Sequence, residues 1–162
     1  ISFGTNTIDF ETYTLLITPS LSGNNQNFAQ AIITQTGVPI NAPEILEVNN
    51  PAEVEIPSGS NTTNVLFTAK VIDEDGQSNI DKVLLNFRNE DGSLLQETPF
   101  ELLDDGNSSS GDLASSDSVY TISFSIDSNN TPSNRTAFYW AIDKSGLTSD
   151  TLETPFKLVD NE

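Results

Sequence analysis

The stretch "SVYTISFSID", Ser118–Asp127, decides the fold class of this chain. Small polar residues separate its apolar ones, which recur at every second position: Tyr120, Ile122, Phe124 and Ile126. Successive side chains of a β-strand point to opposite faces. The alternation therefore predicts a strand with one face in a core and the other in water.

Four other runs in the chain show the same alternation. Their apolar rows, which we expect to face the core, are Val65, Phe67, Ala69 and Val71; Val83, Leu85 and Phe87; Phe138, Trp140 and Ile142; and Leu152, Phe156 and Leu158. In the third row we expect Trp140 to be buried and Tyr139 to point to the opposite face. Turn-forming residues separate the runs, and no run has helical periodicity.

Strands of this length and spacing predict an all-β fold, an immunoglobulin-like antiparallel β-sandwich of about seven strands. We place this sandwich in residues 43–162. Residues 1–42 hold two more strand candidates, "IDFETYTLLITP" and "FAQAIITQTG", followed by a linker, "GVPINAP". This extra strand pair is either a remnant of a preceding β domain or docks on the sandwich, because a lone hairpin is marginally stable in water.

The net charge of the chain excludes some classes of binding partner. Its 162 residues include 24 acidic and 6 basic ones, for a formal net charge of −18. Neutralising phosphate takes clustered Lys and Arg, so we expect neither nucleic acid nor an anionic membrane surface as a partner. No apolar run has the length of a membrane span. The chain starts at Ile1, and we expect a mature or excised fragment.

Catalysis is not expected. The chain contains no Cys, His or Met, so the usual nucleophile–base pairs and the usual ligands of zinc, iron and copper are missing. Its carboxylates lie in Ser-rich turns, where nothing would desolvate them and raise a pKa for acid–base work. We therefore expect a non-enzyme.

The loop "LLDDGNSSSGDLASSDSVYT", residues 102–121, concentrates carboxylates just before the strand quoted first. Calcium takes six to eight oxygen ligands, many of them from Asp and Asn in flexible loops. We expect Gly106 and Gly111 to adopt positive φ. The loop is either a cation cage or a solvated turn, and the candidate ligands for Ca2+ are Asp104, Asp105, Asp112 and Asp117.

Three motifs together resemble bacterial surface immunoglobulin-like domains. "LLDDG…GDL…SDSVYT" is similar to their DDG…GD…GDGVY loop, seen in Bacteroidetes-like envelope proteins and lipoproteins. "VIDEDGQSNIDKVLLNF" resembles their B–C corner, and "FYWAIDKSGLTS" their F–G corner. Ser116 and Ser118 stand where the family pattern has glycine. The resemblance implies a β-sandwich module that is accessory or adhesive, on a secreted or envelope-anchored protein.

A second acidic loop, "DEDGQSNID" at residues 73–81, offers Asp73 and Asp75 for another ion. It lacks the Glu at the twelfth position that an EF-hand loop requires. The alternative is a plain corner turn made by Asp75 and Gly76.

These observations predict a non-catalytic structural or adhesive module of a bacterial cell-surface or secreted protein, stabilised by calcium. We expect an extracellular or envelope location, with anchoring through a segment that is not present here. The partners would be other domains of the same chain or other surface proteins. The alternative is a carbohydrate-binding accessory domain of a glycan-uptake or polysaccharide-degrading system, whose partners would be glycans.

Overall fold

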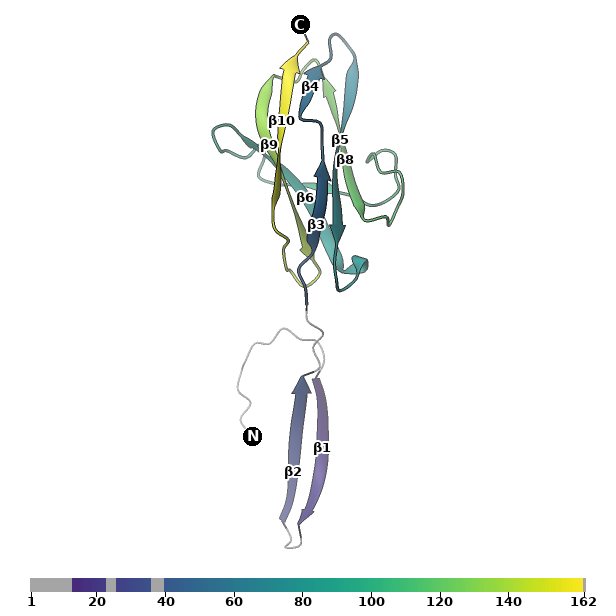
Figure 1. The fold of residues 1–162 in the computed structure, drawn as a ribbon, viewed down its shortest axis with the longest axis vertical. Coiled ribbons are helices and arrows are strands. Elements are labelled where there is room, and N and C mark those ends of the chain that lie inside the picture. Colours follow the sequence, from purple (N-terminus) through teal and green to yellow (C-terminus); the bar gives the residue numbers. More distant parts are fainter. Residues whose placement is uncertain (1–12, 23–25, 36–39, 162) are drawn as a thin grey trace. The chain divides into compact units, whose positions relative to one another are not determined.

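A computed structural model describes residues 13–22, 26–35 and 40–161 (Figure 1). The chain divides into two compact units, Ile1–Ile40 and Asn41–Glu162. In the first unit, β1 (Tyr13–Ser22) and β2 (Gln26–Gln35) pair antiparallel, which confirms the extra strand pair. Residues 8–12 of the first predicted strand and residues 37–39 of the predicted linker lie outside the described residues. The relation of this pair to a preceding domain stays a prediction.

The second unit is a sandwich of two sheets. The three-stranded sheet has the order β3-β5-β8, formed by Glu44–Asn49, Thr62–Ile72 and Val119–Asp127. The five-stranded sheet has the order β4-β10-β9-β6-β7, formed by Glu53–Ile56, Leu152–Asp160, Ser133–Asp143, Ile80–Asn89 and Phe100–Leu102. A short 3-10 helix, Gln77–Asn79, joins β5 to β6.

This strand order is that of an immunoglobulin-like sandwich. β3, β5 and β8 take the places of strands A, B and E, and β6, β9 and β10 those of C, F and G. All pairings in the unit are antiparallel except that of β4 with β10. The expected all-β, immunoglobulin-like architecture is confirmed.

Aromatic rings fill the space between the sheets. Phe67 is 1% exposed and makes edge contacts with Phe87, Phe124 and Phe156, at centroid distances of 5.1–5.4 Å. Edge-to-face contacts of this kind are the favoured geometry for aromatic pairs. The predicted core rows of β5, β6, β8 and β10 all lie in this core or pack against it.

The prediction for β9 was wrong, because the two faces of this strand are exchanged. Tyr139 is fully buried with Ala137 and Ala141 on either side, while Phe138 and Trp140 point outward and are half-buried. The aromatic core leaves room for only one large side chain on this strand, and the two alanines flank it. The Tyr139 hydroxyl donates to Asn50 Oδ1 at 2.9 Å, which satisfies its one polar atom.

The seven-strand estimate missed β4. Its four residues lie between Pro51 and Pro57, and two of them are glutamates, so the run is too short and too polar to stand out. β3 and β4 are in effect one strand, broken at Asn50–Ala52, whose two halves join different sheets. The strand expected over "SLLQETPF" shortens to β7, and most of that segment is loop.

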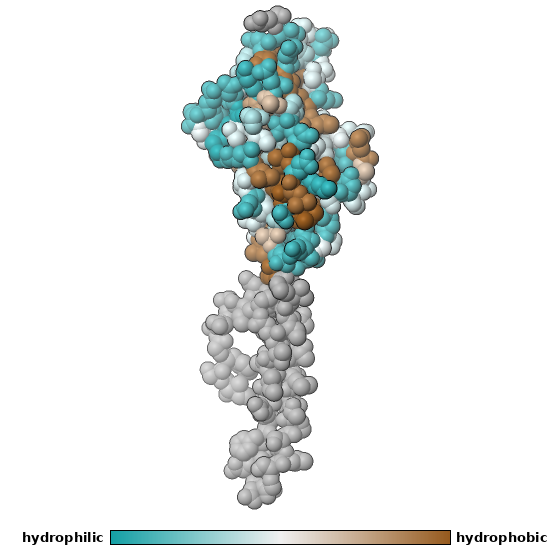
Figure 2. Space-filling model, viewed as in Figure 1, coloured by the Kyte–Doolittle hydropathy of each residue, from teal (hydrophilic) through white to brown (hydrophobic). Residues whose placement is uncertain are grey.

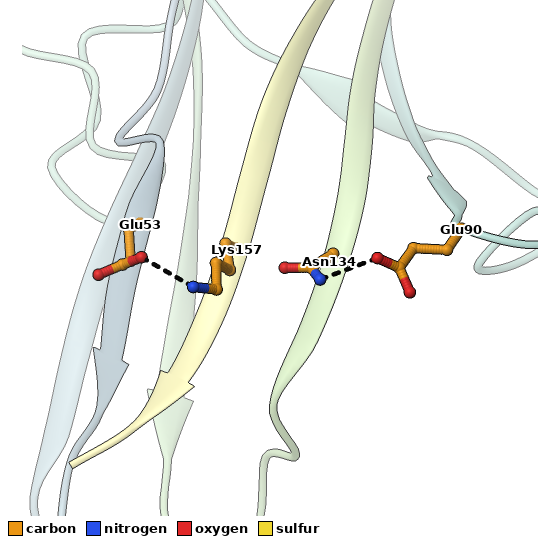
Figure 3. A network of polar contacts seen from close by, with 4 residues as sticks. All are labelled: Glu53, Glu90, Asn134 and Lys157. Atoms are coloured by element: carbon orange, nitrogen blue, oxygen red, sulfur yellow. Dashed lines mark hydrogen bonds and ion pairs between the residues drawn. The ribbon is translucent and has the colours of Figure 1, made fainter. Parts of the chain in front are cut away.

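Polar side chains link the strands of the five-stranded sheet on its solvent side. The Lys157 ammonium on β10 lies 3.2 Å from the Glu53 carboxylate on β4, and Asn134 on β9 donates to Glu90 at 2.8 Å (Figure 3). Both pairs join chain segments far apart in sequence. Exposed pairs of this kind contribute only about 0–1 kcal/mol each.

The surface of the sandwich is mostly polar, with apolar side chains gathered in a few places (Figure 2). Among the exposed leucines, Leu46 and Leu66 lie on the three-stranded sheet, and Leu103 and Leu113 lie on the long loop that follows β7. Among the described residues, no helix has both the length and the apolar character that a membrane crossing requires.

Candidate metal centre

The acidic loop lies between β7 and β8 and closes on itself at its base. Leu103 and Thr121 exchange two backbone hydrogen bonds, of 3.0 and 2.8 Å. The chain therefore leaves and returns at one point, which brings Asp104 beside Asp117, thirteen residues further on. The base of the loop is fixed by the sheet.

Four residues of this loop adopt the left-handed backbone conformation. Gly106 and Gly111 have φ of 66° and 84°, which confirms the prediction for these glycines. Ser116 and Ser118 have φ of 63° and 71°, although they carry a Cβ. A positive φ is uncommon for a residue with a Cβ, so the loop holds both serines in a conformation that glycine would adopt more readily.

Three of the four candidate carboxylates converge. Asp104, Asp112 and Asp117 each offer an oxygen, and these oxygens lie within 4.8 Å of one another. Asp112 is 3% exposed, Asp104 is half-buried and Asp117 is exposed. Three negative charges at this separation repel one another, and a cation placed between them would relieve that repulsion.

Backbone N–H groups hold each carboxylate in place. Gly106 donates to Asp112 Oδ2 at 2.6 Å, and Ser118 to Asp104 Oδ2 at 3.0 Å. Asp117 Oδ1 accepts from Val119 at 2.9 Å. A carboxylate has about four lone-pair sites, so each group keeps acceptor capacity for an ion.

The hydrogen bonds also shift a pKa. The backbone N–H of Gly106, together with that of Ala114, holds the pKa of the Asp112 carboxyl below its usual value, against the opposing effect of burial. A carboxyl with a lowered pKa stays ionised at neutral pH, which is the state that binds a cation.

Asp105, the fourth candidate, lies outside this group. Its Oδ1 accepts from the Asn107 N–H at 3.0 Å and from the Ser110 hydroxyl at 2.9 Å. These bonds close the turn that carries the Ser run. In this structure the side chain of Asp105 shapes the loop, beside the three carboxylates that meet.

The second acidic loop follows β5 and contributes to a buried polar cluster. Asp73 and Asp143 are 8% and 2% exposed, and the side-chain amide of Asn79 lies 3.1 Å from one and 3.4 Å from the other. Asp75 Oδ2 accepts from the backbone N–H of Asn41 at 2.6 Å, and the Asp75 N–H donates to Asp73 Oδ1 at 2.8 Å. The side chains of Asp73 and Asp75, predicted as one site, thus bond different partners.

The sequence analysis named neither Asn79 nor Asp143 as a candidate ligand. Asp143 also shapes its own turn, since the Leu147 N–H donates to Asp143 Oδ1 at 2.7 Å. The contact with Asn79 depends on strand order, which brings the β5–β6 and β9–β10 connections together. No local sequence signal carries that information.

Two aromatic side chains lie on the solvent side of β9, in the five-stranded sheet. Phe138 and Trp140 stack with centroids 5.4 Å apart and planes at 13°. The Arg88 guanidinium lies 5.1 Å from the Phe138 centroid and pairs with Glu153 at 3.0 Å. Each ring therefore covers part of one face of the other.

No protein-family model matches the chain, and no curated protein matches it. Among solved structures, one that is similar is the PKD domain of an M14-like peptidase from Thermoplasmatales archaeon SCGC AB-540-F20. The identity is 14%, the alignment covers 74% of this chain and 98% of that chain, and the TM-score is 0.42.

Proposed function

We propose that this chain is a non-catalytic structural module of a bacterial cell-surface or secreted protein, and that Ca2+ stabilises one side of it. The observation that supports the ion is the convergence of Asp104, Asp112 and Asp117 in a loop whose base is fixed on β8. Three carboxylates from one loop, with room for carbonyl and water oxygens, are a typical calcium ligand set.

The loop is built so that an ion would stiffen it. Asp104 lies at its start, Asp112 in its middle and Asp117 at its end, so one cation would join three points of the loop. The backbone hydrogen bonds to each carboxylate already restrict the conformations of these side chains, so binding an ion would lose less conformational entropy. A module held rigid in this way would present other domains of its chain, or other surface proteins, at a fixed geometry.

The test is a thermal melt of the whole chain with chelator and with millimolar Ca2+. An ion that binds only the folded state stabilises it by RT ln(1 + [L]/Kd), so the midpoint should rise with calcium concentration. Asp104→Asn and Asp112→Asn should each remove the shift. Asp160→Asn, exposed at the end of β10, is the matched control and should keep it.

A midpoint that does not move with calcium would contradict the ion, as would a shift that survives both loop substitutions. The structural role is tested separately. Turnover of glycans or peptides by the purified chain would refute a non-catalytic module whatever the melts show.

One observation favours the alternative function, a carbohydrate-binding accessory domain. Sugar sites on β-sandwiches use aromatic rings at the surface, and Trp140 lies on the solvent side of its sheet. Trp140 is the only Trp of the chain. A titration with oligosaccharides should then quench its fluorescence, and Trp140→Phe binding less glycan would support the alternative. An unchanged spectrum across the glycan panel would rule it out.

A further inference from the structure

The break between β3 and β4 leaves half of one strand without a neighbour. β5 pairs with β8 along Thr62–Lys70, but with β3 only along Thr68–Ile72. After Asn49, the residue of β3 that pairs with Thr68, the chain crosses to the five-stranded sheet as β4. In the described part of the chain, the first half of β5 therefore has no strand on its β3 side.

The backbone groups on this free edge can be identified. The Val71 N–H bonds the Ser118 carbonyl, so odd-numbered residues of β5 face β8. Thr121, which pairs with Thr68 across the ladder, bonds Leu103 on its other side, which agrees with that assignment. Because N–H and C=O groups alternate in direction along an antiparallel strand, those of Asn64 and Leu66 face away from β8. No described residue bonds them.

A groove lies along this edge, with a volume of about 520 Å³. One wall is the break and the start of β4, at Asn49–Pro51, Glu53 and Val54, and the other is β5 at Thr63–Leu66 and Thr68. Core residue Val65 lies at its base. The free half of β5 is about 20 Å long at the usual rise per residue, enough for an added strand.

We propose that this groove binds an extended peptide as an added strand, hydrogen-bonded to Asn64 and Leu66 of β5. Each of these residues would exchange two hydrogen bonds with the residue opposite it. Residues of the peptide that face inward would meet Val54 and Val65, so they should be apolar.

The charge around the groove selects the other positions of the peptide. Glu53, Glu55 and Glu47 are exposed on the two strands that flank the break, and the chain as a whole carries a net charge of −18. Among the described residues, only Glu53 of these three has an ion-pair partner, Lys157. The occupant is therefore a peptide with apolar residues at alternate positions and Lys or Thr between them.

The test uses a synthetic peptide, acetyl-Lys-Val-Thr-Val-Lys-Val-Lys-amide, titrated into the full chain. Binding should slow hydrogen exchange at the Asn64 and Leu66 amides, and a peptide with Glu in place of Lys should bind more weakly. The peptide residues opposite Asn64 and Leu66 point their side chains outward, so they are Lys or Thr, and their N–H groups donate to β5. N-methylation of the Lys and Thr residues should therefore weaken binding roughly tenfold or more. N-methylation of the valines should weaken it far less.

A protein variant tests the same edge. Asn64→Pro removes an N–H that faces the groove and leaves the bonds between β5 and β8 in place, so it should fold and bind less peptide. Thr63→Pro removes an N–H that faces β8 and is the matched control for strand damage. The N-methylated peptides decide the matter even if Asn64→Pro does not fold.

Three outcomes would overturn the proposal. They are equal binding of the N-methylated and unmethylated peptides, absence of binding, and protection at amides other than those of Asn64 and Leu66. Sedimentation of the protein alone tests whether a second copy of the chain occupies the groove. A dimer in which the Asn64 and Leu66 amides are protected would show that the occupant is this second copy and not a peptide.

Discussion

Ser116 and Ser118 are the residues at which the acidic loop departs most from ordinary backbone geometry. Both hold a left-handed conformation that costs a residue with a Cβ about 1–2 kcal/mol. The Ser118 N–H bonds Asp104, so the strained position is also the one that ties the two ends of the loop together. The chain accepts this strain where the metal candidates converge.

Ser118→Gly should therefore stabilise the protein. Glycine removes the strain but gains freedom in the unfolded chain, which leaves a net increase of about 0.5–1 kcal/mol in the free energy of unfolding. Urea unfolding measures it. Ser115→Gly, in the same loop without positive φ, should destabilise by a similar amount. Equal losses in the two variants would show that the backbone at Ser118 is unstrained.

Acid should remove the contribution of Asp112. Its pKa is lowered in the folded state from 3.8, so its stabilising effect is present above about pH 4 and is lost as the pH falls through the folded-state value. The stability difference between the wild type and Asp112→Asn, measured by urea unfolding, should shrink as the pH falls below about 4. A constant difference for Asp112→Asn would contradict the shift.

At this scale the sequence predicted much of the loop. Gly106 and Gly111 were identified as positive-φ positions because two glycines among Asp and Ser residues have few other reasons to be there. Convergence of the three carboxylates could not be read from spacing. It depends on the hydrogen bonds between Leu103 and Thr121, which are contacts across the sheet.

Among the elements, the acidic loop is seated directly on β5. A Cβ on Gly111 would lie 2.3 Å from Leu66 Cδ2 and 3.3 Å from Thr121 Cγ2. The loop therefore rests on the outer face of the three-stranded sheet, where an added Cβ would have to displace the end of the Leu66 side chain.

Gly111→Ala should cost more than Gly92→Ala, although the two glycines have nearly the same φ, 84° and 85°. A Cβ at Gly92 meets nothing within 4 Å, so that variant loses only the backbone term, about 1 kcal/mol. Gly111→Ala must in addition displace the end of the exposed Leu66 side chain, which adds to that cost, and Leu66→Ala should relieve the addition. Equal costs in thermal melts would show that the loop is not seated on Leu66.

The faces of β9 show where pattern analysis fails. Hydropathy favoured the row with Phe138 and Trp140, and the structure buries the row with Tyr139. The reason is volume. Phe67 on the facing sheet and Phe87 on the neighbouring strand β6 already fill the core, and the two alanines of β9 leave space for one ring. Alternation gives the period of a strand, but the choice of face depends on the partner strands.

This assignment can be tested by truncation. Phe67→Ala should cost about 3–5 kcal/mol, because it empties the centre of the core. Trp140→Ala, on the solvent side, should cost about 1 kcal/mol, mostly through its contact with Phe138. Denaturant unfolding followed by far-ultraviolet circular dichroism measures both. A larger loss of unfolding free energy for Trp140→Ala than for Phe67→Ala would show that Trp140, and not Tyr139, faces the core.

For the molecule as a whole, one polar contact joins the two sheets at the strand break. Asn50 Oδ1 accepts from Tyr139 at 2.9 Å and from Thr154 at 2.5 Å, so residues of β9 and β10 hold the point where β3 gives way to β4. Burial raises the pKa of Tyr139, which keeps its hydroxyl protonated as a donor. The overall architecture was predictable from strand number and spacing. This crossing was not, because β4 carries no signal of its own.

Tyr139→Phe should lower the free energy of unfolding by about 1–3 kcal/mol, because it leaves Asn50 short of a donor. Tyr120→Phe, whose hydroxyl accepts a 3.3 Å hydrogen bond from Gln77 Nε2 in the same unit, is the control for loss of a tyrosine hydroxyl. Chemical unfolding of the second unit, followed by Trp140 fluorescence, gives the comparison. A change at Tyr139 no larger than that of the control would mean that the contact adds nothing to stability.

The parallel pairing of β4 with β10 determines how the second unit would respond to tension. β4 lies near the start of this unit and β10 at its end, and they run side by side in the same direction, with Lys157 bonded to both Ala52 and Glu53. A pull on the two ends draws these strands past each other along their length. All of their hydrogen bonds then carry the load together and cannot open one by one, so the unit would resist extension until the whole pair fails at once.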